Sequence, residues 1–391
     1  MRKDSLHVVY IGVSGFPIGL AAISRQKLVS RGLINAGAEV TVLCARSVHN
    51  QGASVERAGV FEGVPYRYAV SPFRDQNFLV RNLKRKLDWL FELIELVKIN
   101  QQKKVTHVII SNTNVFRYAL WIRCIAYLMG FKMVLSLVEI YKGRRGQSFL
   151  TRVNNYLFNH FGLKFFDGYL PISHQLEKYF SPFNIPGFYY PIIVDIEKIK
   201  NIGIYHFEQP NFVFCGAAGY VNTIEFVLKA FDAVQSRHSR LTLVAGGSPE
   251  EIKVVREMIK NAKNAERVFH LFNLSDEELY SLYSESQALL LPLFDTVQDQ
   301  ARFPHKLGEY LASGTCVITT RVGDLQYYLH HEKSAYIVEP GDVHQFSEMM
   351  DRVVLDPDKA KNVGKMGLEV CKENFEFQKV GAECKRFLLE L

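Results

Sequence analysis

In the second half of the chain the sequence reads Arg302-Phe303-Pro304-His305-Lys306-Leu307-Gly308-Glu309-Tyr310-Leu311-Ala312-Ser313-Gly314. This pattern predicts a short helix with one polar face. Pro304 suits the first helical turn, where its missing N–H would have no partner in any case. Gly314 is typical of a residue that ends a helix, and the apolar run from Cys316 to Ile318 predicts the next strand.

Lys306 and Glu309 are three residues apart, so they share one face near the start of this helix, where backbone N–H groups lack partners. A lysine there can bind a phosphate together with the helix dipole. A carboxylate one turn later can accept two O–H bonds from a ribose diol. The pair therefore indicates a nucleoside-diphosphate ligand. The alternative is an ordinary ion pair on a helix surface, and the spacing alone favours neither.

The segment from Pro304 to Gly323 resembles the signature of the family four glycosyltransferases, a large retaining group with the GT-B fold. The resemblance implies that Lys306 contacts the donor diphosphate and that Glu309 contacts the ribose. It also implies that Lys306 and Arg302 act in catalysis by stabilising the diphosphate.

The family pattern places a further glutamate eight residues before Glu309, where this chain has Ala301. Some subgroups replace that glutamate with an Asp-containing loop followed by Arg-x-Pro-x-Lys, which the segment from Asp295 to Lys306 resembles. The resemblance therefore implies that Asp295 takes part in donor binding.

The composition is that of a globular protein with more than one domain. At 391 residues the chain is too long for one ordinary α/β core and predicts two domains of about 190 residues each. The 48% hydrophobic and 22% charged residues exclude a disordered or fibrous chain. The six cysteines have no paired spacing, which favours free thiols in a reducing cytosol.

Targeting and membrane signals are weak. Arg2 and Lys3 precede an apolar run, but Gly15 and Pro17 interrupt that run, so we do not expect a signal peptide. Charged residues also interrupt the hydrophobic region 105–140, so we expect no transmembrane helix.

The formal net charge of +7 favours acidic partners. The sequence contains no helix-turn-helix spacing, zinc pattern or ribonucleoprotein signature, so we do not expect nucleic acid as a partner. Lipid phosphates and sugar phosphates remain.

The first half begins with a predicted strand, Leu6 to Val13, a glycine loop from Gly12 to Gly19, and a helix. Such a loop lets the backbone approach a ligand at the carboxyl end of a strand, where open α/β sheets bind ligands. The alternative is that these glycines serve only the path of the chain. The segment also resembles the opening of the same family, which implies donor contacts at Gly15 and Gly19 and a phosphate or acceptor contact at Arg25.

Residues 78–100 predict an amphipathic basic helix. The apolar positions are Leu79, Leu83, Leu87, Leu90 and Ile94, and the cations are Arg81, Lys84, Arg85 and Lys86. The commoner interpretation of such a pattern is a helix whose apolar stripe faces the core. The alternative is docking on an anionic membrane surface, which the nearby aromatic residues favour.

A predicted strand ends at Glu139 and is followed by the cations Lys142, Arg144 and Arg145. Because ligand sites gather at the carboxyl ends of strands, we expect Glu139 to accept bonds from sugar hydroxyls or act as a base. The three cations are candidates for binding the phosphates of an acceptor. Alternatively, these charges only neutralise one another.

The second half again alternates strands with helices, which predicts a second parallel sheet. The loop after its first strand contains Gly216 and Gly219 and resembles the donor-binding loop of the family. Members often carry Arg and Lys in this loop, where this chain has Ala217 and Asn222. Phosphate binding is therefore expected to depend on Lys306 and Arg302.

Asp356 and Asp358 have the spacing of a metal-binding pair, but they fall at a predicted helix start, where capping is the favoured role. We expect no essential metal.

These observations predict an α/β protein of the GT-B class, with two doubly wound Rossmann-like domains facing a central cleft. Residues 1–195 would bind the acceptor and residues 196–374 the nucleotide sugar, with a C-terminal helix at 375–391 packing back on the first domain. The expected donor is a UDP- or GDP-sugar and the expected acceptor a glycan or lipid-linked glycan. No further cofactor is expected. The expected location is the cytoplasm, at the inner face of the membrane. A sugar-nucleotide epimerase and a non-catalytic nucleotide-sugar-binding scaffold are the alternatives.

Overall fold

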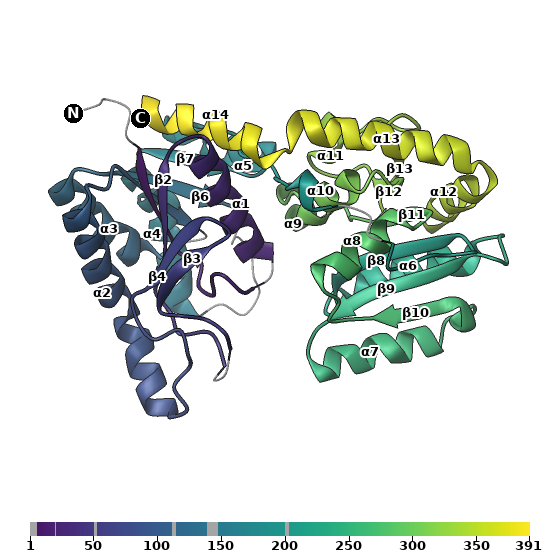
Figure 1. Ribbon diagram of the computed structural model, residues 1–391, viewed down its shortest axis with the longest axis horizontal. Helices are drawn as coiled ribbons and strands as arrows, with labels where there is room; N and C mark the ends of the chain where they lie inside the picture. The colour runs from purple at the N-terminus through teal and green to yellow at the C-terminus, as the bar shows by residue number, and fades with distance from the viewer. Residues whose placement is uncertain (1–5, 20, 51–52, 112–114, 139–147, 200–202) are drawn as a thin grey trace. The chain divides into compact units, whose positions relative to one another are not determined.

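The computed structural model describes residues 6–19, 21–50, 53–111, 115–138, 148–199 and 203–391. The chain forms two units, coloured from purple to yellow along the sequence in Figure 1. Unit 1 consists of Met1–Ile193 together with Phe377–Leu391, and unit 2 of Val194–Glu376. The domain ends predicted at residues 195 and 374 each lie two residues from the observed ends at 193 and 376.

Unit 1 is built on a seven-stranded sheet in the order β3-β4-β2-β1-β5-β6-β7. The strands are β1 (His7–Ile11), β2 (Glu39–Cys44), β3 (Ala58–Phe61), β4 (Val64–Tyr68), β5 (His107–Ser111), β6 (Lys132–Leu137) and β7 (Gly168–Pro171). All neighbouring strands are parallel except β3 and β4, which form an antiparallel pair at the edge. Every residue of β1 and β5 is buried, as expected for central strands covered on both faces.

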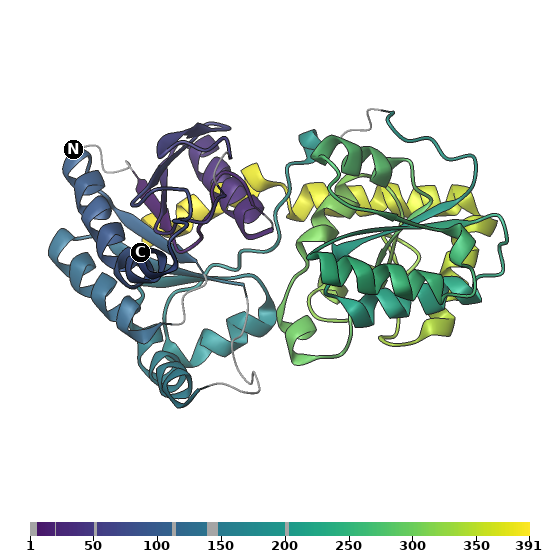
Figure 2. The ribbon, with the colours of Figure 1, turned by 90° about the horizontal axis from the view of Figure 1, so that it is seen from below.

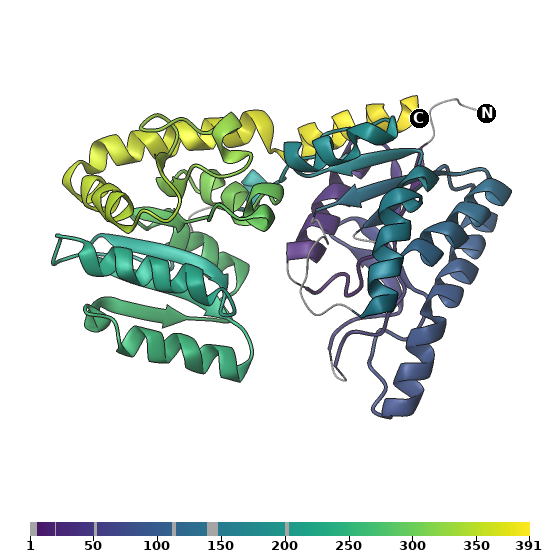
Figure 3. The same ribbon diagram turned by 180° about the vertical axis from the view of Figure 1, so that it is seen from behind.

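The helices of unit 1 are α1 (Ala21–Asn35), α2 (Phe78–Gln102), α3 (Phe116–Met129), α4 (Phe149–His160), α5 (His174–Phe180) and α14 (Phe377–Glu390). Helices α1 and α14 cover one face of the sheet, and α2 and α3 cover the other (Figures 1 and 3). A Cβ atom on Gly381 would lie 2.5 Å from the Cα of Gly32, so the backbones of α14 and α1 are in direct contact. The C-terminal helix therefore belongs to unit 1.

Unit 2 is built on a six-stranded parallel sheet in the order β10-β9-β8-β11-β12-β13, with helices on both faces (Figure 2). The strands are β8 (Asn211–Ala217), β9 (Arg240–Gly246), β10 (Val268–Leu271), β11 (Ala288–Leu291), β12 (Val317–Thr320) and β13 (Tyr336–Val338). The helices are α6 (Val221–Ala233), α7 (Pro249–Lys260), α8 (Asp276–Ser284), α9 (Val297–Ala301), α10 (His305–Ala312), α11 (Leu325–Tyr328), α12 (Val343–Leu355) and α13 (Pro357–Asn374).

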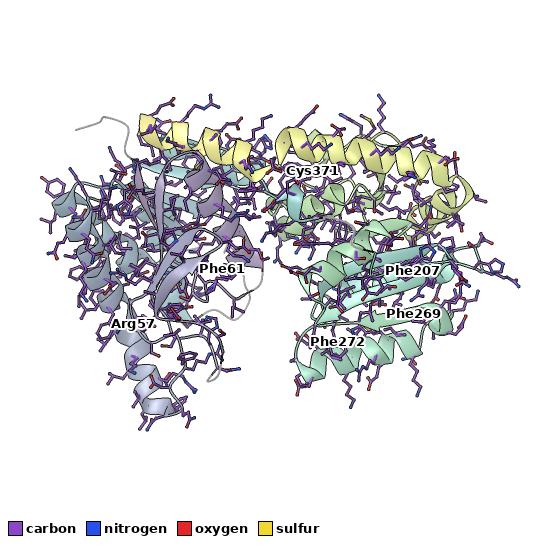
Figure 4. The ribbon with its side chains drawn as sticks, viewed as in Figure 1. Arg57, Phe61, Phe207, Phe269, Phe272 and Cys371 are labelled. Carbon is purple, nitrogen blue, oxygen red and sulfur yellow. The ribbon has the colours of Figure 1, made fainter. Side chains whose placement is uncertain are left out.

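The helix predicted after Pro304 is α10, and Gly314 follows it with φ of 73°. Helix α13 packs directly on this segment, because a Cβ atom on Gly364 would lie 2.3 Å from the carbonyl oxygen of Gly314. The Cys371 thiol, labelled in Figure 4, lies 3.6 Å from the carbonyl oxygen of Gly308. These two contacts hold α10 and Gly314 against α13.

The order of the strands in each sheet indicates at which edge a ligand would bind. The strand order reverses beside β1 in unit 1 and between β8 and β11 in unit 2. Open α/β sheets bind ligands outside the carboxyl ends of the strands at such a reversal. In unit 1 the glycine loop after β1 lies there. In unit 2 the loops after β8 and β11 flank this position.

Helix α2 confirms the helix predicted over residues 78–100 but does not bury the predicted stripe. Leu79, Leu83, Leu87, Leu90 and Ile94 are all exposed. The buried face is instead formed by Asp88, Leu93, Glu92, Glu95, Leu96 and Ile99. The core-facing interpretation of the stripe was therefore wrong, because the buried face of α2 is a different one that combines carboxylates with Leu93, Leu96 and Ile99. No helix among the described residues is both long and apolar enough to cross a bilayer.

Glu92 is the most buried of these carboxylates, with 2% of its surface exposed. Its Oε2 accepts a hydrogen bond of 2.7 Å from the Tyr118 hydroxyl, and its Oε1 has no hydrogen-bond partner among the described residues. Burial raises the pKa of Glu92 to about 7, against the effect of the Tyr118 hydrogen bond. Ionised Glu92 therefore opposes folding.

We predict that Glu92→Gln makes the protein more stable than the wild type above pH 7 and not at pH 5. The folded chain binds the Glu92 proton more tightly than the unfolded chain, so the wild type loses stability as pH rises from about 4.5 to 7. Glutamine stays neutral and still accepts from Tyr118, so the gain at pH 8 should be about 1–3 kcal/mol. Urea unfolding at both pH values measures it.

Glu95→Gln is the matched control. Burial opposes ionisation of Glu95, but hydrogen bonds from Arg67 and Lys98 lower its pKa. Its removal should therefore destabilise the protein at pH 8. A Glu92→Gln variant with the same relative stability at pH 5 and pH 8 would contradict the assignment.

Candidate functional site

The residues of the predicted nucleotide site lie at the reversal point of the unit 2 sheet. Lys306 and Glu309 occupy the first turns of α10, and their side chains form an ion pair with Nζ and Oε2 2.6 Å apart. Fifteen per cent of the Glu309 side chain and 32% of the Lys306 side chain are exposed. The pair is thus half-buried and differs from an ion pair on an open helix surface.

The electrostatics of this pair favour the ionised forms. Burial disfavours the Lys306 ammonium, but attraction to Glu309 outweighs burial and holds the pKa of Lys306 above its ordinary value. Lys306 therefore stays cationic at every physiological pH, as a phosphate ligand requires.

Two tyrosines from distant segments support Lys306. Its Nζ lies 3.2 Å from the hydroxyl of Tyr283 in α8, and the Tyr283 ring packs edge-on against Tyr310. The Tyr310 hydroxyl accepts a 2.9 Å hydrogen bond from the N–H of Cys215 in β8. These contacts join α8, α10 and β8. The sequence motif around Lys306 did not predict a role for Tyr283, because Tyr283 lies 23 residues away from Lys306 in the sequence.

Arg302 lies beside the loop that follows β8. Its guanidinium carbon is 5.4 Å from the centre of the Tyr220 ring, and Nη2 is 2.7 Å from Oδ1 of Asp299. Gly219 belongs to the same loop as Tyr220, and Gly216 is the second-last residue of β8. The structure therefore brings together Arg302 and the predicted glycine loop, and it adds Tyr220 and Asp299, which the sequence analysis missed.

Asp295 and Ala301 have different environments. Asp295 is exposed, and its Oδ1 accepts a 2.9 Å hydrogen bond from the Gln300 amide. Ala301 is 2% exposed at the end of α9. A side chain at position 301 therefore points into the protein.

In unit 1 the glycine loop lies at the carboxyl end of β1, with Gly15 buried at φ of 120° and Gly19 exposed. The Tyr68 hydroxyl fixes this loop by donating a 2.7 Å hydrogen bond to the carbonyl oxygen of Phe16. His49 in turn lies 2.9 Å from the Tyr68 hydroxyl. These two glycines belong to unit 1, and the other predicted donor contacts belong to unit 2.

The environment of Arg25 differs from that expected of a phosphate or acceptor contact. Its side chain is buried in α1, with Nη1 and Nη2 donating to the carbonyl oxygens of Pro191 and Tyr190 at 2.7 and 2.8 Å. The guanidinium also packs 5.0 Å from the centre of the Tyr190 ring. The side chain thus holds the end of unit 1 in place and is not open to an acceptor.

The other residues predicted to serve the acceptor, Glu139, Lys142, Arg144 and Arg145, lie outside the described residues. Asp356 accepts a 3.0 Å hydrogen bond from the N–H of Lys359 and caps α13, which confirms its predicted capping role.

The comparisons with known proteins agree with this geometry. Residues 195–370, nearly all of unit 2, match the family model described as glycosyl transferases group 1. N-acetyl-alpha-D-glucosaminyl L-malate synthase of Bacillus anthracis is 25% identical to this chain over 160 residues. That match covers 41% of this chain and 40% of the relative, so it spans less than half of either protein.

Solved structures extend the likeness to both units. Sucrose-phosphate synthase from Thermosynechococcus elongatus has a TM-score of 0.76 at 15% identity, over 97% of this chain and 98% of its own. Anabaena HepE in complex with UDP has a TM-score of 0.71 at 13% identity, over 99% and 100% of the two chains. At such identities the likeness establishes the fold. Unit 2 therefore resembles the group 1 glycosyl transferases, and the chain as a whole has the GT-B fold.

Proposed function

We propose that this chain is a retaining glycosyltransferase that moves a sugar from a nucleoside-diphosphate sugar to a glycan or lipid-linked acceptor in cell-surface polysaccharide synthesis. The observation that carries the proposal is the half-buried Lys306–Glu309 pair at the reversal point of a group 1 unit. The pair supplies one cation for a phosphate and one carboxylate for a ribose diol.

The proposed donor is a UDP- or GDP-sugar, used as a co-substrate without a further cofactor. The complex of HepE with UDP, a protein of the same fold, supports this choice. Gly216, near the end of β8, and Gly219, in the β8–α6 loop, are the proposed backbone contacts of the donor.

The proposed chemistry depends on the departing diphosphate. The acceptor hydroxyl attacks the anomeric carbon from the side of the leaving group, and a diphosphate oxygen takes the acceptor proton as the glycosidic bond to phosphate breaks. Negative charge then grows on the diphosphate, where Lys306 and Arg302 stabilise it electrostatically. In this scheme the chain's own cations do the work of a metal, so chelators should not abolish turnover. Glu139 and the cations after it would serve the acceptor.

Two alternatives remain testable. An epimerase of the same fold would consume the nucleotide sugar without an acceptor, so product analysis separates it from a transferase. A scaffold that has lost turnover is favoured by Ala217, Asn222 and Ala301, which stand where the resembled family often carries functional side chains. Such a scaffold would bind nucleotide sugars without hydrolysing or transferring them.

We predict that a thermal-shift panel of UDP-, GDP-, ADP- and CMP-sugars raises the melting temperature for a UDP- or GDP-sugar. Ligand that binds only the folded state stabilises it by mass action, about 2.7 kcal/mol at a hundred times Kd. A panel in which no nucleotide sugar shifts the melting temperature would refute the proposed function.

We predict that Lys306→Ala weakens UDP or GDP affinity about 10- to 100-fold, since a charge-assisted hydrogen bond to phosphate is worth about 1.5–3 kcal/mol. Isothermal titration calorimetry measures the loss. Lys229→Ala is the matched control, because Lys229 forms a 2.7 Å ion pair with Glu225 on the exposed face of α6. Wild-type affinity and turnover in Lys306→Ala would remove Lys306 from the site.

We predict that Glu309→Gln weakens nucleotide binding less than Glu309→Ala, because glutamine keeps one oxygen acceptor for the ribose. The same titration with UDP and GDP compares the two variants. Equal and negligible effects would show that the carboxylate serves only to pair with Lys306.

We also propose that unit 1 docks on the inner face of an anionic membrane, where a lipid-linked acceptor would lie. The outer stripe of α2 is apolar, and Trp89 of α2 stacks on Trp121 of α3 at 5.7 Å between ring centres. Helices α3 and α4 contain arginines but no acidic residue. Arg123 pairs with Asp167 at 2.8 Å and Lys84 with Asp75 at 2.9 Å, so the exposed apolar residues carry most of this proposal and the cations add to it. The side chains of Arg85 and Lys86 lie outside the described part.

We predict that the wild type sediments with vesicles containing anionic phospholipid, and that binding falls as salt rises. Each cation near such a surface is worth about 1 kcal/mol and is screened by salt. Replacing Lys84, Arg85 and Lys86 with glutamate should abolish binding.

A second pair of variants tests the apolar contribution. Leu79→Ser combined with Leu83→Ser should weaken vesicle binding at every salt concentration, whereas Leu355→Ser, at an exposed leucine of unit 2, should not. If the wild type ignores anionic vesicles at low salt, membrane docking is wrong and a soluble acceptor is the better choice.

A further inference from the structure

The loop after β8 has no cation of its own. The segment from Gly216 to Thr223, which runs from the end of β8 into α6, contains no lysine or arginine, although it borders the reversal point of the sheet. Strand β11 is the hydrogen-bonded neighbour of β8, so the segment after β11 lies beside this loop. That segment ends in Arg302. Arg302, from the segment after β11, therefore supplies a positive charge beside the loop that follows β8.

Two contacts hold the Arg302 guanidinium in this place. Nη2 forms a 2.7 Å ion pair with Oδ1 of Asp299, and the planar group lies over the Tyr220 ring at 5.4 Å. Nη1 is 3.4 Å from the Tyr220 hydroxyl, a long contact. One quarter of the side chain stays exposed. A guanidinium has five N–H donors, so donors remain for a ligand after these contacts are made.

Asp299 is buried and hydrogen-bonded to the chain around it. It is 7% exposed, and its Oδ2 accepts a 2.8 Å hydrogen bond from the N–H of Phe294. Its own N–H donates to Oγ1 of Thr296, the cap of α9. One carboxylate oxygen binds the backbone, the other binds Arg302, and the residue is buried. Asp299 is therefore placed to act on a ligand through Arg302 and not by direct contact.

We propose that Asp299 and Tyr220 are positioning residues that hold Arg302 against the donor diphosphate, so that Arg302 supplies the charge that the β8–α6 loop lacks. This inference rests on the proposed function. Asp299 binds one edge of the guanidinium, and the Tyr220 ring packs against its face. The other N–H groups of Arg302 are therefore held in one orientation before the donor binds. The Arg302 side chain thereby loses its conformational entropy when the protein folds, and binding of the donor does not have to order it.

The test is a double-mutant cycle read by calorimetric titration with UDP and GDP. Asp299→Asn should weaken affinity about tenfold in the wild-type background, because asparagine offers Arg302 no charge. In an Arg302→Ala background the same substitution should have little further effect, since Asp299 acts through Arg302. Equal losses in both backgrounds, or none in the wild-type background, would overturn the inference.

Tyr220 provides a second route if Asp299→Asn impairs folding. Tyr220→Phe keeps the ring under the guanidinium and should bind like the wild type, whereas Tyr220→Leu should weaken binding several-fold. Glu225→Gln, at the exposed α6 ion pair, is the control and should bind normally. If Asp299→Asn and Tyr220→Leu lower only the melting temperature and leave the affinity per folded molecule unchanged, the two residues have a purely structural role. That result would refute the inference.

The outcomes also separate this inference from the proposed function. A wild type that binds neither UDP nor GDP refutes both. A wild type that binds normally, with variants that bind equally well, refutes only the positioning role.

Discussion

Parallel strand pairing is the constraint on which the rest of the structure depends. A parallel strand can be joined to its neighbour only by a crossover, so each sheet must carry helices on its faces and direct all its carboxyl ends to one edge. Where the strand order reverses, two neighbouring crossovers leave on opposite faces and open a crevice at that edge. In unit 2 this topology places Tyr220, from the loop after β8, beside Arg302, from the segment after β11.

The cations of the unit 2 site are paired with carboxylates from the same short segment. Lys306 pairs with Glu309, and Arg302 pairs with Asp299, each at a spacing of three residues. A half-buried cation without such a partner would cost desolvation energy, so the pairing lets unit 2 fold with its charges ionised and in place. The two carboxylates differ, because Asp299 also binds the backbone of Phe294. The Arg302–Asp299 pair is therefore also tied to the backbone, through Asp299.

Unit 1 shows how residue type alone can mislead. An arginine in the first helix after a glycine loop has the chemistry of a phosphate ligand, yet Arg25 is buried on the carbonyl oxygens of Tyr190 and Pro191. The leucine stripe of α2 has the period of a core face, yet it is exposed while Glu92 and Glu95 are buried. In both cases the partners come from distant segments. Carbonyl oxygens bind Arg25, Arg67 binds Glu95, and Tyr118 donates one hydrogen bond to Glu92.

The sequence by itself determined the features that depend on neighbours within a few residues. The start of α10 after Pro304, its end before Gly314 and the Asp356 cap all follow from local backbone chemistry. The alternation of strands and helices likewise predicted two parallel sheets. The three-residue strand β13 (Tyr336–Val338) was missed, because so short a run has no readable period without its neighbour β12. The tertiary structure alone decided which face of α2 is buried, that Arg25 is closed to ligands, and that Tyr283 and Tyr220 lie beside Lys306 and Arg302. Those outcomes depend on contacts between residues far apart in the chain, which sequence spacing does not encode.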